Sequence, residues 1–543
     1  MKNPYLYFVF LSLFSCYQGQ EADLIIHNAK IYSCDEDFTI YEAMAIKDGK
    51  ILQLGPEREI LNGYDCDNII DAQLKAIYPG FHDAHCHFWA YAQTLSEVDL
   101  NGSKSFDEVV ERVVDFEKEN KSDWITGRGW DQTLWPENDF PKNDTLNFIF
   151  PDKPILIRRV DGHAALANAK ALEIAGITID TKIEGGLIGI ENGKLTGLLL
   201  DNAFDSVAKY VPDFASDKKL ELLQDAEYNL FAVGLTSIND AGIESKYRED
   251  FITWYKNGDL TIKDYCMLFP DDDNLKFASD NGIFKTGNLH IRSFKLVADG
   301  AMGSRGACLL EPYHDDVHNH GFLLQSEKQF REIAEFALEI NYQINTHAIG
   351  DSANRVMLKI YADLVQDKQD HRWKIEHAQV LSPDDFHYFE TIRIIPSVQP
   401  THCTSDMRWA EDRLGTERVK YAYAYKLLLQ KAGLLALGTD FPIENISPLE
   451  TFYAAITRMD KTGNPVGGFF PEQVLTRQEA LLGMTRWAAY SNFEDKEKGS
   501  LEPGKAADFV ILTKDIMEIP VSEILKTFVE KTFLNGVEVF SAE

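Results

Sequence analysis

The stretch Pro79-Gly-Phe-His-Asp-Ala-His-Cys-His87 decides the fold, because it places histidines at the end of an apolar run. His85 and His87 are two residues apart, so on a β-strand both imidazoles face the same side. Two imidazoles at one strand end can bind a metal ion. Such a pair is also found among ordinary surface or core histidines, and that alternative stays open for the motif alone. Cys86 faces the opposite side, so we do not expect it to act as a ligand or nucleophile.

Ligand-type residues recur at the ends of other apolar runs. His347 ends the run 342–347, His377 ends the run 373–377, and Asp440 ends the run 434–440. Each residue taken singly could be structural. Four strand ends with histidine or aspartate in one chain favour a shared metal site instead.

Strand-like and helix-like segments alternate through the middle of the chain, which is typical of parallel β/α units. We therefore predict an α/β fold, a (β/α)8 TIM-like barrel over residues 80–498, with its active site at the strand C-termini. A segment rich in Trp, Gly and Pro, at about 101–224, is predicted to be an insertion over the barrel mouth. The apolar runs are 153–158, 234–239, 289–296, 342–347, 373–377, 394–399 and 434–440, and helix-like stretches include 352–366 and 448–458.

Both ends of the chain are rich in short β-type runs. Asp48-Gly49 and Asn535-Gly536 each lie between two such runs and are hairpin signals. Chain termini are often close in space. We therefore predict one small β-sandwich built from residues 22–79 and 499–543.

The first sixteen residues resemble an export signal. Lys2 precedes a short apolar run that is too short to span a bilayer, and Leu13-Phe14-Ser15-Cys16 resembles a bacterial lipobox. This predicts a signal peptide over 1–16 and a lipid on Cys16, hence an exported, lipid-anchored protein of a bacterial cell envelope. Membrane contact would occur through that anchor only. Ordinary secretory cleavage nearby is the alternative. The other six cysteines show no Cys-X-X-Cys spacing.

Composition excludes some classes of function. The chain has 543 residues, 45% of them hydrophobic, which is enough for a large domain and a smaller one. Its formal net charge of -32 argues against nucleic acid as a partner, because phosphate binding needs basic surface. The charge says little about a small-molecule substrate.

Four longer motifs are more specific than the histidine pair. They begin at Gly127-Arg-Gly-Trp-Asp, Arg159-Val-Asp-Gly-His, Phe294-Lys-Leu-Val-Ala-Asp-Gly and Gly438-Thr-Asp-Phe-Pro. With these motifs the chain resembles the amidohydrolase superfamily, specifically its amidohydrolase-3 branch of hydrolases similar to N-substituted formamide deformylase. The resemblance runs from about residue 22 to residue 539, nearly the whole mature chain.

The resemblance implies a ligand set. His85 and His87 would bind the more buried metal, and His347 and His377 a second one. Lys295 stands where many relatives hold a carboxylated lysine that bridges two metals; an unmodified lysine paired with Asp299, and a single metal, is the alternative. Zinc is the expected ion with histidine ligands, one or two per chain, and manganese or iron is not excluded.

Asp440 would be both a metal ligand and the catalytic base. A carboxylate beside metal-bound water can take its proton and deliver it to a departing nitrogen. The alternative is a helix N-cap before Pro442.

Several other residues are candidates for substrate contact. Trp130, Asp131 and Trp135 could wall a pocket, His163 could donate to the oxyanion, and Arg305 could pair with an anionic group, although ordinary loop packing explains each as well. The expected reaction is hydrolysis of a small-molecule amide, N-formyl group or cyclic amide, with esters and lactones open. The alternative is an exported metal-containing protein that binds a ligand without turnover. No Gly-X-Ser-X-Gly elbow supports a serine hydrolase. The sequence does not decide between a monomer and a homodimer.

Overall fold

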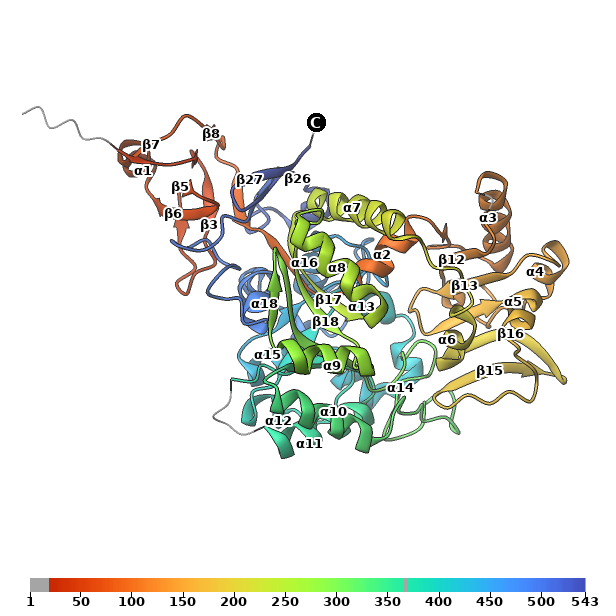
Figure 1. Cartoon of the computed structure of the whole chain (residues 1–543). Coiled ribbons are helices and arrows are strands. Elements are labelled where there is room, and N and C mark those ends of the chain that lie inside the picture. Colours follow the sequence, from red (N-terminus) through yellow and green to blue (C-terminus); the bar gives the residue numbers. More distant parts are fainter. Residues whose placement is uncertain (1–18, 121, 366–369, 543) are drawn as a thin grey trace, which may run out of the picture.

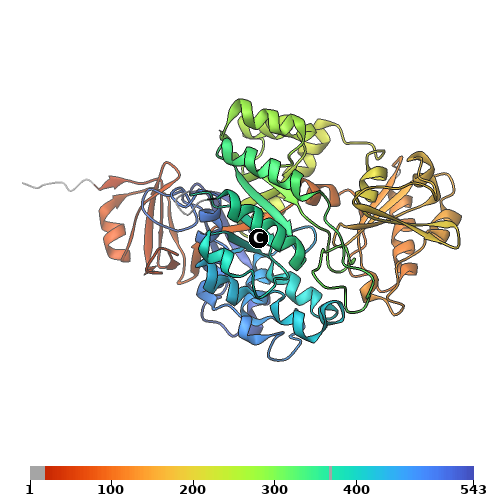
Figure 2. The ribbon, with the colours of Figure 1, turned by 90° about the horizontal axis from the view of Figure 1, so that it is seen from below.

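The computed structural model describes residues 19–120, 122–365 and 370–542. The predicted signal peptide and Cys16 therefore lie outside the described residues. Figures 1 and 2 show three parts: the N-terminal strands at one end, a barrel in the middle, and the insertion at the other end. None of the helices in the described part of the chain combines the length and apolar character needed to cross a bilayer.

The central part is the predicted (β/α)8 barrel. Eight parallel strands follow one another in the order β10-β17-β18-β20-β21-β22-β23-β24. Two backbone hydrogen bonds join the last segment to the first, from Asp440 N to His85 O at 2.7 Å and from His87 N to Phe441 O at 2.8 Å. The strands are β10 (Phe81–Cys86), β17 (Leu235–Ile243), β18 (Lys263–Leu268), β20 (Leu289–Val297), β21 (Gln343–Ala348), β22 (Lys374–His377), β23 (Ile395–Val398) and β24 (Ala436–Leu437).

A glycine permits this closure. A Cβ on Gly438 would lie 2.5 Å from His85 N and 2.7 Å from Asp83 Oδ1, so only glycine lets the two segments approach this closely. Asp83 strengthens the junction, because its carboxylate accepts hydrogen bonds from Thr439 N, Thr439 Oγ1 and His85 N. The first and last barrel segments are thus joined at the level of the predicted ligands.

Helices cover the outside of the barrel. Helix α10 (Glu327–Glu339) starts at a capping box formed by Ser326 and Gln329 and buries apolar residues spaced three and four apart. The others are α2 (Phe88–Thr94), α7 (Ser216–Ala232), α8 (Ser245–Asn257), α9 (Asp272–Asn281), α11 (Asp351–Leu364), α12 (His387–Thr391), α13 (Pro400–Asp406), α14 (Ala410–Arg418), α15 (Tyr425–Ala432), α16 (Pro448–Thr457), α17 (Arg477–Gly483) and α18 (Arg486–Ser491).

The two ends of the chain form the predicted sandwich. One sheet has the order β6-β5-β2-β8, and the other has the order β27-β26-β25-β9-β3-β4, so strands from both termini share a sheet. Apolar side chains from the two sheets, including Ile26, Ile46, Phe509 and Phe533, form its core. The strands are β2 (Leu24–His27), β3 (Lys30–Tyr32), β4 (Ile40–Tyr41), β5 (Ala43–Lys47), β6 (Lys50–Gly55), β8 (Ile69–Asp71), β9 (Ala76–Pro79), β25 (Phe509–Leu512), β26 (Val529–Leu534) and β27 (Val537–Ser541).

Both predicted hairpin turns are present. Asp48 and Gly49 have φ of 51° and 74° and connect the antiparallel strands β5 and β6. Asn535 and Gly536 have φ of 48° and 73° and connect β26 and β27. Positive φ at both central residues is the requirement that selects Asx-Gly in such turns.

A separate sheet lies within the insertion. Its order is β11-β12-β13-β14-β16-β15, and the run 153–158 belongs to it rather than to the barrel. The sheet begins at Val98, and its β15–β16 hairpin ends at Asp201. The predicted end of the insertion, at about residue 224, falls within α7, and this helix packs against α2 of the barrel. The elements are β11 (Val98–Asp99), β12 (Ile125–Trp130), β13 (Ile155–Arg159), β14 (Ala164–Ala167), β15 (Gly186–Glu191), β16 (Lys194–Asp201), α3 (Phe106–Glu119), α4 (Asp144–Ile149), α5 (Ala169–Ile174) and α6 (Asn202–Ala208).

Candidate metal centre

The barrel brings the predicted ligands to one point. His85, His377 and Asp440 offer ligand atoms that all lie within 4.8 Å of one another. Lys295 Nζ lies 3.1 Å from His85 Nε2, and His87 Nε2 lies 3.1 Å from Asp440 Oδ1. These residues come from the ends of β10, β20 and β22 and from the segment after β24.

His347 completes the group from β21. Its ring centroid is 4.5 Å from that of His377, and its Nε2 lies 3.7 Å from Asp299 Oδ1. Asp299 also accepts backbone hydrogen bonds from Ile349, Gly350 and Cys308. Asp299 is therefore held by backbone N–H groups. The close contact of Lys295 is with His85 rather than with Asp299, the partner in the alternative interpretation.

Unpartnered nitrogens show that these residues fit a metal. His347 Nε2 and His377 Nδ1 are buried and have no hydrogen-bond partner in the described structure. A buried polar atom without a partner costs about 1–3 kcal/mol, so two at one point need an explanation. A divalent cation with imidazole and carboxylate ligands supplies it, because neutral imidazole nitrogens and an ionised carboxylate are what such an ion binds.

The protonation states at this point favour metal binding. Burial lowers the pKa of His87 to about 4 and holds the pKa values of His347 and His377 well below the ordinary value. Burial raises the pKa of Asp440, but the His85 imidazole and the close contact with His87 outweigh it, so this pKa lies well below its usual range. The imidazoles of His87, His347 and His377 are thus neutral, and the Asp440 carboxylate is ionised, at neutral pH.

The backbone is strained at two of the ligands. His377 has φ of 71° and Asp440 has φ of 63°, in the left-handed region that residues with a Cβ rarely adopt. Such conformations cost about 1–3 kcal/mol and cluster at functional sites, where the surrounding structure holds them. Asp440 precedes no helix directly, since α16 begins at Pro448, so the N-cap interpretation does not describe its geometry.

Glu376 is a part of the centre that the sequence did not reveal. Its Oε2 lies 2.6 Å from His85 Nδ1, and both side chains are fully buried. The contact directs Nε2 of His85 toward the other ligands, as carboxylate partners of metal-bound histidines do. Its position directly before His377 was a signal, but its partner is 291 residues away in the sequence.

His402 was also missed. It lies in α13, its ring stacks on His377 at 5.7 Å with an interplanar angle of 7°, and its Nε2 is 3.6 Å from Asp440 Oδ2. The search for ligands at strand ends passed over it because β23 ends at Val398 and His402 belongs to the following helix. Only the Pro400 that starts this helix marked the position.

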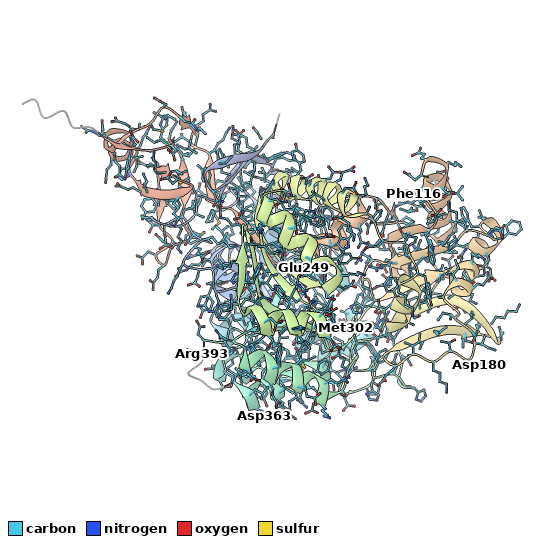
Figure 3. All side chains as sticks on the ribbon, in the orientation of Figure 1. Phe116, Asp180, Glu249, Met302, Asp363 and Arg393 are labelled. Carbon is cyan, nitrogen blue, oxygen red and sulfur yellow. The ribbon has the colours of Figure 1, made fainter. Side chains whose placement is uncertain are left out.

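A cavity of about 270 Å³ opens beside the ligands and is walled by both the barrel and the insertion. Of the predicted contact residues, Asp131 and His163 line it. Figure 3 labels Met302, another lining residue, at the junction of the two parts. His163 Nδ1 lies 2.8 Å from Asp201 Oδ1, and its ring centroid is 5.3 Å from that of His347.

Three other predicted residues are not brought to the cavity. Trp130 is fully buried in the insertion core, where Nε1 donates to Ile157 O, and Trp135 packs beside it, 6.1 Å between ring centroids. Arg305 pairs with Asp315 at 2.9 Å. Apolar burial explains the tryptophans, and this ion pair occupies the arginine, so none of the three lines the cavity.

Buried imidazoles around an ionised carboxylate, at the mouth of a (β/α)8 barrel, define the centre of a metal-dependent hydrolase. The chain belongs to the amidohydrolase family: the model of this family, the amidohydrolase-3 branch, matches residues 68–540. The family predicted from the sequence motifs is thereby confirmed.

Relatives match nearly the whole chain. The protein LONG AFTER FAR-RED 3 of Arabidopsis thaliana is 31% identical, over 96% of this chain and 92% of its own length. N-substituted formamide deformylase of Arthrobacter pascens is 26% identical, over 95% of this chain and 98% of its own length. A crystal structure of an uncharacterized metal-dependent hydrolase from Pyrococcus horikoshii OT3 aligns with a TM-score of 0.75 and 28% identity, covering 92% of this chain and 99% of that one.

Proposed function

We propose that this protein hydrolyses a non-peptide C–N bond in a small amide, N-formyl compound or cyclic amide. The observation that carries the proposal is an ionised Asp440 carboxylate placed among His85, His87 and His377. A protein that only binds a ligand has no need of a buried base at its metal site. The similarity to an enzyme named N-substituted formamide deformylase supports the same bond type.

His85, His87, His347, His377 and Asp440 would hold one or two ions, with zinc expected and manganese or iron as alternatives. When bound, the ion supplies a water of lowered pKa and a positive charge for the carbonyl oxygen. Lys295 would contribute as a carbamate. Burial lowers the pKa of Lys295, which increases the neutral amine that carbamylation requires.

Asp440 would move the proton. Because its pKa lies well below the usual range, the carboxylate is free to accept a proton from the attacking water. The same oxygen can then deliver this proton to the departing nitrogen. The His87 imidazole, whose Nε2 lies 3.1 Å from Asp440 Oδ1, holds the carboxylate in place for both transfers.

His163 would orient the substrate from the insertion side. Burial lowers its pKa, but the hydrogen bond and charge of Asp201 outweigh it and raise the pKa above the ordinary value. With Nδ1 bound to Asp201, Nε2 is left to donate a hydrogen bond to the substrate carbonyl oxygen. Apolar lining residues, among them Val297, Ile349 and Trp409, help to exclude water.

The test combines metal analysis with substrate turnover. The purified protein is assayed for bound metals and for hydrolysis of a panel of amides, N-formyl amines, cyclic amides and esters, before and after chelation. We expect at least one ion per chain, turnover of a C–N substrate, loss on chelation and recovery with Zn²⁺. A fully metal-loaded protein that hydrolyses only esters, or nothing in a broad panel, would contradict the proposal.

We further propose that the protein is exported and anchored through a lipid on Cys16, on the basis of the sequence Leu13-Phe14-Ser15-Cys16 alone. Expression in bacteria with a labelled fatty acid tests this. Label should enter the wild-type chain and not the Cys16→Ser chain, and an unlabelled wild type would contradict it.

A further inference from the structure

One wall of the cavity is built by helix α13 and the segment after β24. His402, Ser405 and Asp406 are spaced three and four residues apart on α13, so they share one helix face, and all three line the cavity. Glu444 joins them, with Oε1 2.6 Å from Ser405 Oγ. We call these four residues the α13 wall.

Two arginines and two aspartates that also line the cavity neutralise one another. Arg159 lies 2.7 Å from Asp131 and 2.6 Å from Asp161, and Arg408 lies 3.1 Å from Asp131. The Arg159 Nε also donates to Gln132, so its guanidinium is fully engaged. These carboxylates and guanidinium groups therefore satisfy one another without a ligand.

The carboxyls of the α13 wall have no such partner. Within the described residues, neither Asp406 nor Glu444 forms an ion pair. Asp406 Oδ2 accepts from Tyr423 at 2.7 Å and from Gln379 at 3.4 Å, and Glu444 Oε1 accepts from Ser405. Asp406 Oδ1 and Glu444 Oε2 have no hydrogen-bond partner in the described structure, and both residues face the cavity.

A second observation points to a ligand at this wall. His402 is only 9% exposed, yet its Nε2 has no hydrogen-bond partner, and the residue lines the same cavity. Burial also raises the pKa values of Asp406 and Glu444 to about 7. A positive ligand would lower both pKa values and satisfy both free oxygens.

We propose that the α13 wall is a subsite for a cationic nitrogen group, so that the substrate is a small amide that also carries an ammonium or guanidinium. This inference rests on the hydrolase function proposed above and names its substrate class. An ammonium has three N–H donors, and two of them can donate to the unpaired oxygens, Asp406 Oδ1 and Glu444 Oε2.

The wall also fixes where the cationic group lies along the substrate. His402 Nε2 is 3.6 Å from Asp440 Oδ2, so the α13 wall begins beside the reacting carboxylate. A cavity of about 270 Å³ leaves room for only a short spacer. The cationic nitrogen therefore lies a few bonds from the scissile C–N bond.

Discrimination follows from the same contacts. A site built to bind a charged donor rejects an analogue that lacks it, because the two half-buried carboxyls then stay unpaired. An anionic analogue is rejected more strongly, since like charges would meet. The net charge of -32 on the whole chain also favours the approach of cations.

The first experiment compares three substrates of equal length on the metal-loaded protein: N-formyl-1,3-diaminopropane, N-formylbutylamine and N-formyl-β-alanine. They differ in having an ammonium, a methyl or a carboxylate at the far end. We expect kcat/KM for the cationic compound to exceed that of the neutral one at least tenfold, mainly through KM, with the anionic compound slowest. Equal rates, or a preference for the neutral or anionic compound, would overturn the subsite.

Variants assign the preference to the wall. Glu444→Gln and Asp406→Asn keep the side-chain shape and remove the charge, and each should reduce the ratio of cationic to neutral kcat/KM several-fold. The matched control is Glu335→Gln, which removes an acid from the exposed face of α10. It should leave the ratio at its wild-type value. A wild-type ratio in both wall variants would contradict the assignment.

A binding measurement separates this inference from the proposed function. Propylammonium is titrated calorimetrically into the metal-loaded full-length protein, with 1-propanol as the neutral comparison. Saturable binding of the amine that is weakened in Glu444→Gln supports the subsite even if no C–N substrate is turned over, in which case the hydrolase proposal alone fails. Turnover of C–N substrates without binding of propylammonium would contradict the subsite proposal and leave the hydrolase proposal intact.

Discussion

The terminal sandwich and the barrel mouth differ in how they treat buried polar atoms. Within residues 19–79 and 499–542, no buried side-chain nitrogen or oxygen lacks a hydrogen-bond partner. Asp515, for example, accepts from Lys30, Tyr32 and Tyr78, each at 2.8 Å. At the mouth, His347, His377 and His402 each leave a buried nitrogen unpaired.

This difference separates stability from function. Unpaired buried atoms and left-handed backbone at His377 and Asp440 both raise the free energy of the folded state. The unpaired atoms persist where a ligand or a reaction uses them, and the sandwich, within residues 19–79 and 499–542, leaves none. Changes at the mouth should therefore alter chemistry more than folding, and changes in the sandwich should do the reverse.

The largest effect is expected for Asp440→Asn. The amide keeps the shape of the side chain but cannot accept the proton, so kcat should fall about 10²–10⁴-fold. Metal content should stay near the wild-type value, because His85 and His377 remain. The check is steady-state kinetics together with elemental analysis of the same preparation. An unchanged rate would refute Asp440 as the base.

Glu376→Gln should have the next largest effect. Its carboxylate lies 2.6 Å from His85 Nδ1, and removing the partner of a metal-bound histidine typically weakens metal affinity about 10–100-fold. Competition with a chelator of known affinity measures this. Because Glu376 is fully buried, thermal unfolding of the metal-free variant serves as the control. A loss of stability without any loss of metal affinity would make Glu376 a structural residue only.

The sequence located the sandwich and most of the side chains that meet at the barrel mouth, because both depend on local patterns. Asx-Gly turns and ligands at strand ends are visible within ten residues, and the strands containing His347 and His377 were located to within one residue. Barrel strand β18 was not singled out, and the run 153–158 belongs to the insertion sheet.

Contacts across the chain could not be predicted in the same way. Glu376 and His85 are 291 residues apart, and the pairing of His163 with Asp201 joins the turn before β14 to the end of β16. Trp130 was a candidate for the wall of a pocket, but it packs into the core of the insertion sheet. Spacing along the chain fixes which side of a strand a residue faces, but not which distant group meets it.

In the metal-free protein, falling pH should remove the stability contributed by the barrel mouth before it removes the stability contributed by the sandwich. Burial lowers the pKa of His87 from 6.5 to about 4, so the unfolded chain binds the proton first, and the stability present above pH 6.5 is lost as pH falls toward 4. Burial raises the pKa of Asp515, but Lys30 and its other hydrogen-bond donors lower it below 3.8, so its contribution is lost only below that pH. Urea unfolding between pH 7 and 3 measures both phases.

Replacing His87 by glutamine provides the control for this pH dependence. The His87→Gln protein should lose less stability between pH 6.5 and 4, while its loss below pH 3.8 stays the same. If the His87→Gln protein loses as much stability between pH 6.5 and 4 as the wild type does, His87 is not the cause of that loss.

The smallest effect is expected for Gly536→Ala, which tests the sandwich side of the comparison. Gly536 has φ of 73°, where alanine costs roughly 1–2 kcal/mol, and a new Cβ would lie 2.9 Å from Ile46 Cγ2. Gly193→Ala is the matched control: it also follows an asparagine in a hairpin, with φ of 74°, but its Cβ would have no atom within 4 Å. The difference in unfolding free energy between the two variants therefore isolates the contact with Ile46. Both should keep the wild-type metal content and kcat, and a loss of kcat in Gly536→Ala at full metal occupancy would mean that the sandwich takes part in catalysis and that the two regions are not separable.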